Sequence, residues 1–418
     1  MTYRHFFRAA LAVGAALAFS GVANATDGYF VNGMGAKAKG AGGVAIAMPD
    51  DAVAIAANPA AAVDLGERLD LGIEVFVPSR GVEITGNVPL GGKWSGNGAN
   101  PFVLPEVAYV KPLNKTFAAG ITVVGNGGMN TNYDANPFGN FGAQGEAGVN
   151  LRQIFITPTI AARIAEGHSI GISPILLLQS FSMTGIQPFT AASSAPLQMT
   201  NNGDDWAFGA GLRVGYLGHL GKSVSVGAFY QSKVWSGRFE KYAGLFAGRG
   251  DFDVPASWGF GVALRPSSRL TLGADYKRIE YAGVASVGNP LAPLFSGNLF
   301  GSENGPGFGW QNIDVVKFGI AYKTSDTLTL RAGYGRSDNP VPASQTFLNL
   351  LAPGVVTDHF TAGATVKVDG KLELTGYVMH APRNWVYGSG SIPQPYGGGE
   401  ANIRLAETAA GFSAGFLF

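Results

Sequence analysis

Residues 206–216 read WAFGAGLRVGY, and large apolar side chains recur at alternate positions along this stretch. One face carries Trp206, Phe208, Leu212 and Tyr216, whereas the other face carries small residues and Arg213. A period of two predicts a β-strand with one apolar face. The same alternation recurs in four further segments, which are residues 223–230, 269–276, 327–334 and 360–368.

Alternating strands occur both in soluble β-sandwiches and in membrane β-barrels. The strands expected here are about ten residues long, which exceeds the typical strand of a sandwich. The face opposite the apolar one is small as well as polar, which is typical of a barrel wall between lipid and a partly filled lumen. A sheet in lipid must close on itself, because an open edge would leave backbone donors unpaired.

The connections between the expected strands alternate between short and long. The short ones are residues 112–115, 165–168, 218–221, 266–268, 324–326 and 369–370, and the long ones are residues 81–104, 129–149, 186–204, 237–253, 283–310, 338–357 and 385–402. Short periplasmic turns and long outer loops are the pattern of outer-membrane barrels. Six short and seven long connections join fourteen strands, with an allowance of two, so we predict an all-β, antiparallel transmembrane barrel over residues 67–418.

The composition narrows the class of protein. The 418 residues are 46% apolar and only 14% charged, against about 25% charged in soluble domains. The net charge of +1 gives no basic surface for nucleic acid, so we expect no nucleic-acid partner. There is no cysteine, which excludes disulfides and thiolate chemistry. No metal, nucleotide or phosphate-binding pattern is present, and we expect no cofactor.

Residues 1–25 resemble a secretory signal peptide. Arg4 and Arg8 precede the apolar run of residues 9–19, and the small residues 23–25 offer a cleavage site before Thr26. The alternative, a membrane anchor, conflicts with the short apolar run, since a helix must cross about 30 Å of hydrocarbon. We therefore expect export and a mature chain that begins at Thr26.

Residues 26–66 lack the alternation and are rich in glycine and alanine. Residues 44–47 and 51–57 are expected to form short helices, with Asp50 and Asp51 at a helix start. Pro59 disfavours helical geometry at Asn58, so a turn is expected there. Small residues allow close packing in a confined space, which favours a plug inside the barrel over a flexible leader.

Several motifs, in order along the chain, are similar to those of one family. They are Pro49–Ala52 with Asn58-Pro59-Ala60, Leu104–Asn114, Gly203–Gly209, Val254-Pro255 with Trp258, Asp338–Ala343, Tyr377–His380 and the terminal Phe418. Together they resemble the long-chain fatty-acid transporters of the outer membrane (FadL-like), a family that includes importers of aromatic hydrocarbons. The resemblance covers residues 26–418 and implies a barrel of the outer membrane of a Gram-negative bacterium. The alternating Phe412, Phe416 and Phe418 also resemble the signal read by the barrel-assembly machinery.

The resemblance implies that an N-terminal hatch closes the barrel, with Asp50, Asp51, Asn58, Pro59 and Ala60 as its motif residues. It further implies that hydrophobic ligands enter from outside and leave sideways through a kink in the third strand. The corresponding strand is expected over residues 116–128. Its end carries the candidate kink residues Gly125, Asn126, Gly127 and Gly128, which could interrupt strand pairing or simply begin the next loop.

The expected partners are hydrophobic small molecules, with long-chain fatty acids as the first choice, together with outer-membrane lipid and lipopolysaccharide. The outward loop 237–253 carries Phe239, Tyr242, Leu245 and Phe246, which we interpret as a capture groove. Mutual packing of these loop aromatics is the alternative interpretation.

Six charged residues fall on the lumen-facing phase of the strands: Arg213, Asp275, Lys277, Arg331, Lys367 and Glu373. Their expected role is structural pairing and attachment of the hatch, with contact to a ligand carboxylate as the alternative for a few. Residues 179–186 lack the basic residues that the fatty-acid prototypes carry near the outer end of their fifth strand. This departure keeps neutral aromatic or aliphatic hydrocarbons open as alternative substrates.

Three other functions remain as rivals: an outer-membrane enzyme, a non-selective porin and an adhesin. The histidines after residue 25 are His168, His219, His359 and His380, and their expected positions do not bring them together with a nucleophile. We therefore expect no enzyme and no catalytic residue. A porin would have a polar constriction without an apolar hatch. The chain is expected to act as a monomer.

Overall fold

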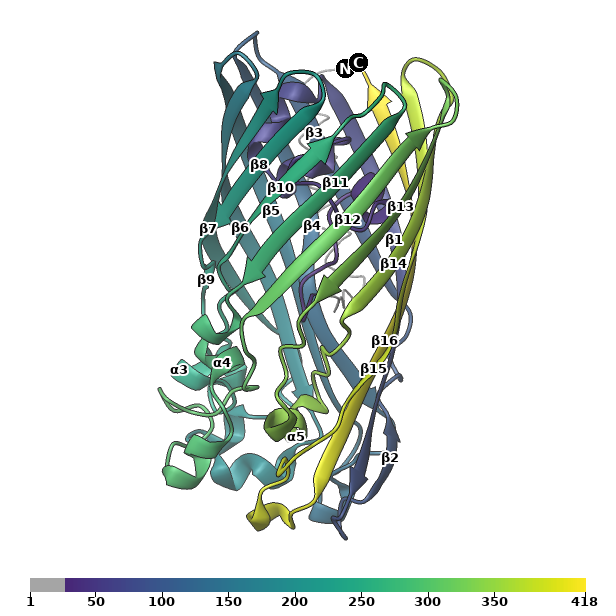
Figure 1. The fold of residues 1–418 in the computed structure, drawn as a ribbon. Helices are drawn as coiled ribbons and strands as arrows, with labels where there is room; N and C mark the ends of the chain where they lie inside the picture. The colour runs from purple at the N-terminus through teal and green to yellow at the C-terminus, as the bar shows by residue number, and fades with distance from the viewer. Residues whose placement is uncertain (1–26) are drawn as a thin grey trace.

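A computed structural model describes residues 27–418, and the expected signal peptide lies outside the described residues. Fourteen antiparallel strands form the wall of a tall barrel (Figure 1), as the alternation predicted. The wall strands are β1 (Arg68–Thr85), β3 (Phe102–Pro112), β4 (Phe117–Tyr133), β5 (Ala147–Ala165), β6 (His168–Thr184), β7 (Asp205–Leu220), β8 (Val224–Gln231), β10 (Ser257–Leu264), β11 (Leu270–Ile279), β12 (Ile313–Lys323), β13 (Leu328–Ser337), β14 (Asp358–Lys367), β15 (Leu372–Val386) and β16 (Glu400–Leu417). Two short strands, β2 (Gly92–Ser95) and β9 (Trp235–Ser236), pair with β1 and β7.

The barrel closes where β16 pairs with β1 along the whole length of β1. The register runs from Arg68 opposite Leu417 to Thr85 opposite Glu400. Closure pairs the two edges that an open sheet would expose to lipid.

The two faces of the wall follow the period of two. In β7 the alternate side chains of Trp206, Phe208 and Leu212 are exposed on the outside, whereas Ala207 and Arg213 are buried. An apolar exterior with a small or polar interior is the arrangement of a barrel that sits in lipid.

The loops divide the molecule into two ends. Six short turns lie at one end, together with the C-terminus, and seven long connections lie at the other (Figure 1). The long connections hold short helices: η3 (Gly139–Phe141), η4 (Gln187–Ala192), η5 (Pro196–Gln198), η6 (Glu240–Tyr242), α3 (Ala247–Gly250), η7 (Tyr281–Gly283), α4 (Ala285–Gly288), η8 (Ala292–Ser296), η9 (Ala343–Gln345), α5 (Thr346–Asn349) and η10 (Gln394–Tyr396). By the usual asymmetry of such barrels, the short-turn end faces the periplasm.

The segment of residues 27–66, which we name the hatch, lies within the barrel near its short-turn end (Figure 1). It forms α2 (Ala36–Gly40) and two 3-10 helices, η1 (Ala52–Ala56) and η2 (Pro59–Asp64). The helix expected over residues 44–47 is wrong. The amides of Ala45 and Ile46 bond to Asp275 on β11, and the Ile46 carbonyl accepts from Asn58, so these backbone groups bond outside the segment.

Among the described residues, no helix combines the length and the apolar character needed to cross a bilayer.

Candidate functional site

A network of ion pairs attaches the hatch to the wall, and we name it the hatch seat (Lys37, Asp50, Arg68, Arg331 and Glu373). Lys37 Nζ lies 2.7 Å from Glu373 Oε2, and Arg68 Nη2 lies 3.3 Å from the same oxygen. Arg331 pairs with Asp50, and Arg68 also donates to the Asp50 carbonyl at 3.2 Å. The pairs join hatch, β1, β13 and β15, so they fix one side of the hatch to three strands.

The pKa values of the two aspartates in the hatch motif shift in opposite directions. Burial opposes ionisation of Asp50, but the charges of Lys37 and Arg331 outweigh it and hold its pKa well below the usual range. Asp51 accepts the amide of Ala54 at 3.1 Å and so caps η1. Burial and the nearby carboxylate of Asp70 raise the pKa of Asp51 to about 7. One aspartate thus acts as a fixed anion, whereas the other titrates near neutral pH.

The motif Asn58-Pro59-Ala60 docks against β6 and β7. Asn58 Nδ2 donates to the Tyr216 carbonyl at 2.9 Å and to the Ile46 carbonyl at 2.8 Å, while its Oδ1 accepts the Ala60 amide. A Cβ on Gly215 would collide with the Asn58 side chain. Glycine at this lumen position therefore allows the hatch to touch the wall.

The start of the hatch is fixed by a buried carboxylate. Asp27 Oδ2 lies 2.9 Å from Nζ of both Lys277 and Lys317, and Tyr281 donates to its carbonyl. Burial would raise the pKa of Asp27, but the two lysines lower it to about 2. Asp27 is therefore an anion that neutralises charge on β11 and β12.

The hydrogen-bonded ladder between β3 and β4 is incomplete. Their pairing runs only from Pro112 opposite Ala118 to Val107 opposite Val123, although both strands continue past that point. The next backbone hydrogen bonds on this side join Asn132 to Gly96 and Gly98. We name the unpaired interval the lateral opening.

The four candidate kink residues lie at the edge of the lateral opening. The register of β4 on β5 shifts between Gly125 and Gly127, which marks a β-bulge at Asn126. The strand continues to Tyr133, so the glycines do not begin the next loop. Gly127 and Gly128 face the hatch: Gly128 donates to the Tyr29 carbonyl at 3.0 Å, and a Cβ on Gly127 would collide with that oxygen.

The inner wall beside the opening is apolar. Phe76, Phe102, Leu104, Met379 and Ala409 form a buried cluster that is separate from the main core. A cavity of about 330 Å³, the middle cavity, lies next to it and is lined by residues that include Phe76, Arg80, Gly128, Trp310, Ala352 and Gly354. Arg80 reaches from β1 to Asn130 on β4, donating to its carbonyl at 2.6 Å, and so links β1 to β4.

A second apolar cavity, which we name the loop cavity, lies among the long loops. The loop cavity is a partly open space of about 490 Å³. It is lined by Phe138, Met183, Ile186, Phe189, Met199, Leu245, Phe246, Ser286, Phe300, Pro306, Gly307, Phe308, Leu348 and Leu351. None of these lining side chains is charged. Aromatic rings pack edge to face around it, for example Phe138 against Phe189 with centroids 5.0 Å apart.

The four residues expected to capture ligand separate into two roles. Leu245 and Phe246 line the loop cavity. Phe239 and Tyr242 are fully buried behind it, against Phe181 at centroid distances of 5.5 and 4.8 Å. Mutual packing, the alternative interpretation, therefore describes Phe239 and Tyr242. All four side chains are buried, and the capture role of Leu245 and Phe246 stays a prediction.

The six lumen charges also differ in their surroundings. Arg331 and Glu373 belong to the hatch seat, Asp275 binds hatch amides, and Lys277 binds Asp27. Lys367 is half-exposed near the short-turn end and lies 3.6 Å from Glu373. Arg213 makes no ion pair with any carboxylate among residues 27–418; its side-chain bond goes to Gln231.

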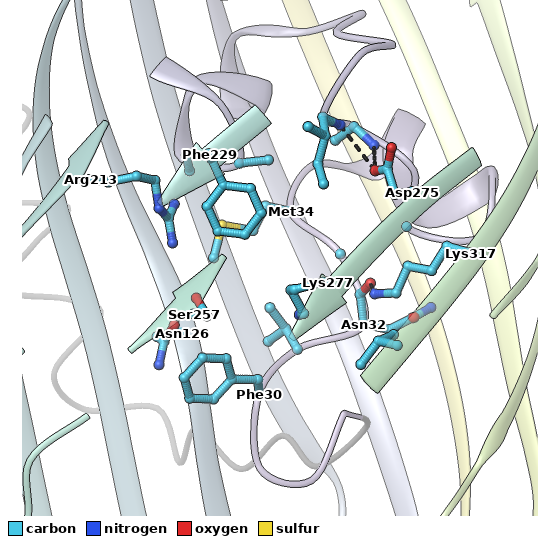
Figure 2. Close-up of a pocket in the computed structure, with 18 residues that line it drawn as sticks. Phe30, Asn32, Met34, Asn126, Arg213, Phe229, Ser257, Asp275, Lys277 and Lys317 are labelled. Carbon is cyan, nitrogen blue, oxygen red and sulfur yellow. Dashed lines mark hydrogen bonds between the residues drawn. The ribbon is translucent and has the colours of Figure 1, made fainter. Parts of the chain in front are cut away.

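A further cavity of about 620 Å³ lies between the hatch and the wall, and we name it the hatch cavity (Figure 2). Phe30 and Met34 of the hatch and Asn126, Arg213 and Phe229 of the wall contribute to its lining. The three cavities have lining residues that are close in sequence: Leu351 lines the loop cavity and Ala352 the middle cavity, while Gly128 lines the middle cavity and Asn126 the hatch cavity.

Sequence reasoning missed Arg80, Phe181, Tyr29 and Phe30. Phe181 lies on the lumen-facing phase of β6, which was a usable signal for burial. The role of Arg80 depends on Asn130, which lies 50 positions away and has no local signal.

Fold and site define a class of protein: a β-barrel of the outer membrane that holds its N-terminal segment inside and has an unpaired interval in its wall. The chain belongs to the family described as "Outer membrane protein transport protein (OMPP1/FadL/TodX)", whose model matches residues 14–378. It is therefore an outer-membrane transporter of hydrophobic compounds, in a family of transporters and not of enzymes.

Solved structures agree with this fold. The toluene transporter TodX of Pseudomonas putida has 21% sequence identity and a TM-score of 0.70, with 94% of this chain and 100% of that chain covered. A FadL homologue of Pseudomonas aeruginosa has 17% identity, a TM-score of 0.70 and coverage of 93% and 99%. The Ralstonia pickettii toluene transporter TbuX has 17% identity, a TM-score of 0.65 and coverage of 93% and 99%. At these identities the likeness concerns the fold alone. A search of the curated proteins finds no match.

Proposed function

We propose that the chain takes up hydrophobic molecules, above all long-chain fatty acids, by capture in the loop cavity and release through the lateral opening. The observation that carries this proposal is the unpaired interval between β3 and β4, with an apolar cluster on its inner side. A pore that ended in the periplasm would force an apolar molecule into water. A side opening leads it into the membrane instead.

The energetics favour this route. Each CH₂ group removed from water contributes about 0.8 kcal/mol, so a long acyl chain binds an apolar cavity with few polar contacts. The loop cavity supplies such a surface on the outer side. The hatch then blocks the straight path, because α2, η1 and η2 all contact wall strands. A bound molecule would leave most easily where the ladder is open.

The hatch is the closing element of this proposal. Asp50 and Asp51 lie in or next to its seat, and Asn58-Pro59-Ala60 fixes its far end to β6 and β7. Gly125, Asn126, Gly127 and Gly128 form the kink that shapes the opening. Residues 26–66 and 67–418 are thus proposed as two functional units, a plug and its barrel.

Deletion of Asn126 tests the route. Removing the bulged residue restores a regular register of β4 on β5, which should narrow the lateral opening and reduce uptake of labelled oleate by whole cells about tenfold or more. Asn126→Ala is the matched control, because it keeps the bulge and changes only the side chain. Equal uptake by the deletion variant and the control, at equal surface expression, would refute lateral release.

Neutral hydrocarbons are a second candidate substrate. The loop cavity has no charged residue in its lining, so nothing there requires an acid. TodX and TbuX, which share the fold, are toluene transporters. Uptake of labelled toluene and labelled oleate by the same cells, with and without the protein, separates the two candidates.

The surroundings of the barrel follow from the same proposal. We infer that the chain works as a monomer without catalysis or cofactor, with lipopolysaccharide around its loops and lipid around its apolar wall. Phe418 is exposed at the end of β16, where the barrel-assembly machinery could bind it. His359 is buried and neither ring nitrogen has a partner among the described residues, which argues against a catalytic pair there.

A further inference from the structure

Arg80 and Arg213 are the two buried arginines among the described residues that pair with no carboxylate, and Arg213 is the one that lines the hatch cavity. It is buried, with a relative exposure of 5%. Figure 2 shows the guanidinium turned into the hatch cavity, on the side of Ser257 and Asn126. By contrast, the buried Arg68 and Arg331 each pair with an aspartate.

The contacts of Arg213 leave donors free. Its Nη2 donates to Gln231 Oε1, and the guanidinium lies over the Phe229 ring, 5.7 Å from the centroid. Its Nε and Nη1 and the Nε2 of Gln231 are buried and lack a partner among the described residues. Three neighbouring nitrogen atoms, two from Arg213 on β7 and one from Gln231 on β8, therefore lack a hydrogen-bond acceptor among the described residues.

The other charges of the hatch cavity do not neutralise Arg213. Lys277 and Lys317 share Asp27 at 2.9 Å, while Asp275 accepts the amides of Ala45 and Ile46. Three cations line or border the cavity against these two carboxylates, so one positive charge is in excess. A buried charge without a counter-ion is costly, and an anion that supplies acceptor oxygens removes that cost.

The rest of the lining fits an apolar tail. Phe30, Val31, Met34, Ile46 and Phe229 line the same cavity. Asn126, at the bulge of β4, lies at its border with the lateral opening. A molecule with its anionic head at Arg213 would therefore have apolar contacts for its tail beside the exit.

We propose that Arg213 and Gln231 form a carboxylate-binding site in the hatch cavity, which makes anionic amphiphiles the preferred cargo over neutral hydrocarbons. This inference rests on the proposed function and names the substrate class. A carboxylate accepts from a guanidinium through charge-assisted hydrogen bonds, which are stronger than bonds between neutral groups. The neutral methyl ester of the same acid has no such charge to offer.

The binding test compares cis-parinaric acid, a fluorescent fatty acid, with its methyl ester, in a neutral detergent at pH 8. For the natural chain we expect the acid to bind about tenfold or more tightly than the ester. Arg213→Met should remove this preference and leave the affinity for the ester unchanged, while Arg213→Lys keeps part of it. Arg265→Gln is the matched control, since Arg265 also bonds a neutral partner, Ser225, but lies at the short-turn end away from the cavity.

The thermal midpoint gives a second readout. Without ligand, Arg213→Met should melt at or above the temperature of the natural chain, because it removes an uncompensated buried charge. Added acid should raise the midpoint of the natural chain but not that of the variant. If Arg213→Met does not fold, Arg213→Gln carries the same comparison.

The outcomes separate this inference from the proposed function. Equal binding of acid and ester by the natural chain, or an unchanged acid preference in Arg213→Met, would overturn the carboxylate site while hydrophobic binding stands. Failure of both acid and ester to bind the natural chain would overturn the proposed function as well.

Discussion

The hatch seat and the loop cavity hold the molecule together by opposite means. In the seat, Lys37, Arg68 and Glu373 meet at distances of 2.7 and 3.3 Å, in a geometry that tolerates little displacement. In the loop cavity, rings such as Phe138 and Phe189 pack without charge, and apolar contacts are not directional. The hatch is therefore fixed by specific bonds, whereas the loop cavity can adapt to different apolar shapes.

The contrast between a hatch held by ion pairs and an apolar loop cavity fits a transporter of hydrophobic molecules. A plug that moved freely would leave an aqueous pore, so directional ion pairs are placed where the hatch meets β1, β13 and β15. A loop cavity that fitted only one rigid shape would exclude hydrophobic molecules of other shapes.

The largest effect is expected from the hatch seat. Glu373→Gln leaves Lys37 and Arg68 without their shared carboxylate, and breaking a buried pair costs about 3–5 kcal/mol. We expect a lower thermal midpoint and a higher ion conductance in planar bilayers, because the hatch is loosened. Glu83→Gln is the control, since its pair with Lys93 is largely exposed and contributes at most about 1 kcal/mol. A silent bilayer and an unchanged midpoint for Glu373→Gln would contradict the role given to the seat.

The loop cavity should give a smaller effect of a different kind. Leu245→Ser with Phe246→Ser removes apolar lining, so we expect the dissociation constant for cis-parinaric acid to rise about tenfold, with no gain in ion conductance. Leu197→Ser in a neighbouring loop is the control, because Leu197 is exposed and does not line the cavity. Unchanged affinity in the double variant would remove the loop cavity from the transport path.

The smallest effect concerns pH. The pKa of Asp51 in the folded chain is about 7, above the ordinary 3.8, so the folded state holds this proton more tightly than the unfolded state. The stability from this group is fully present below about pH 4 and is lost as the pH rises from about 4 to about 7. Asp51→Asn keeps an oxygen for the Ala54 amide but carries no charge.

We therefore expect the thermal midpoint of Asp51→Asn to match that of the natural chain near pH 4 and to exceed it at pH 8. Asp326→Asn, in an exposed turn, controls for the loss of one negative charge. A difference between variant and natural chain that is independent of pH would contradict an ionisable role for Asp51.

The barrel was predictable because its signal is local. The period of two in residues 206–216 places Trp206 outside and Arg213 inside without knowledge of any other strand. The bulge at Asn126 likewise has a local signal in its glycine neighbours. The count of strands followed from turns and loops that can be read one at a time.

The site was less predictable because it joins distant segments. The loop cavity combines Phe138, Met183, Leu245, Phe308 and Leu351 from separate strands and loops, and no spacing links them. The hatch was misjudged where the wall supplies its partners: Ala45 and Ile46 bond to Asp275, 230 and 229 positions away. The missing counter-ion of Arg213 is visible only when all neighbouring carboxylates are placed.

The most direct measurement follows a photoreactive fatty acid through the protein in living cells. A diazirine-bearing acid is activated at successive times after addition, and the labelled residues are identified by mass spectrometry. We expect labels first at Leu245 and Phe246 and later at Phe102 and Leu104 beside the lateral opening. Late labels around Asp64 and His219, where η2 meets the short-turn end, would mean that cargo passes straight through the barrel and would contradict release from its side.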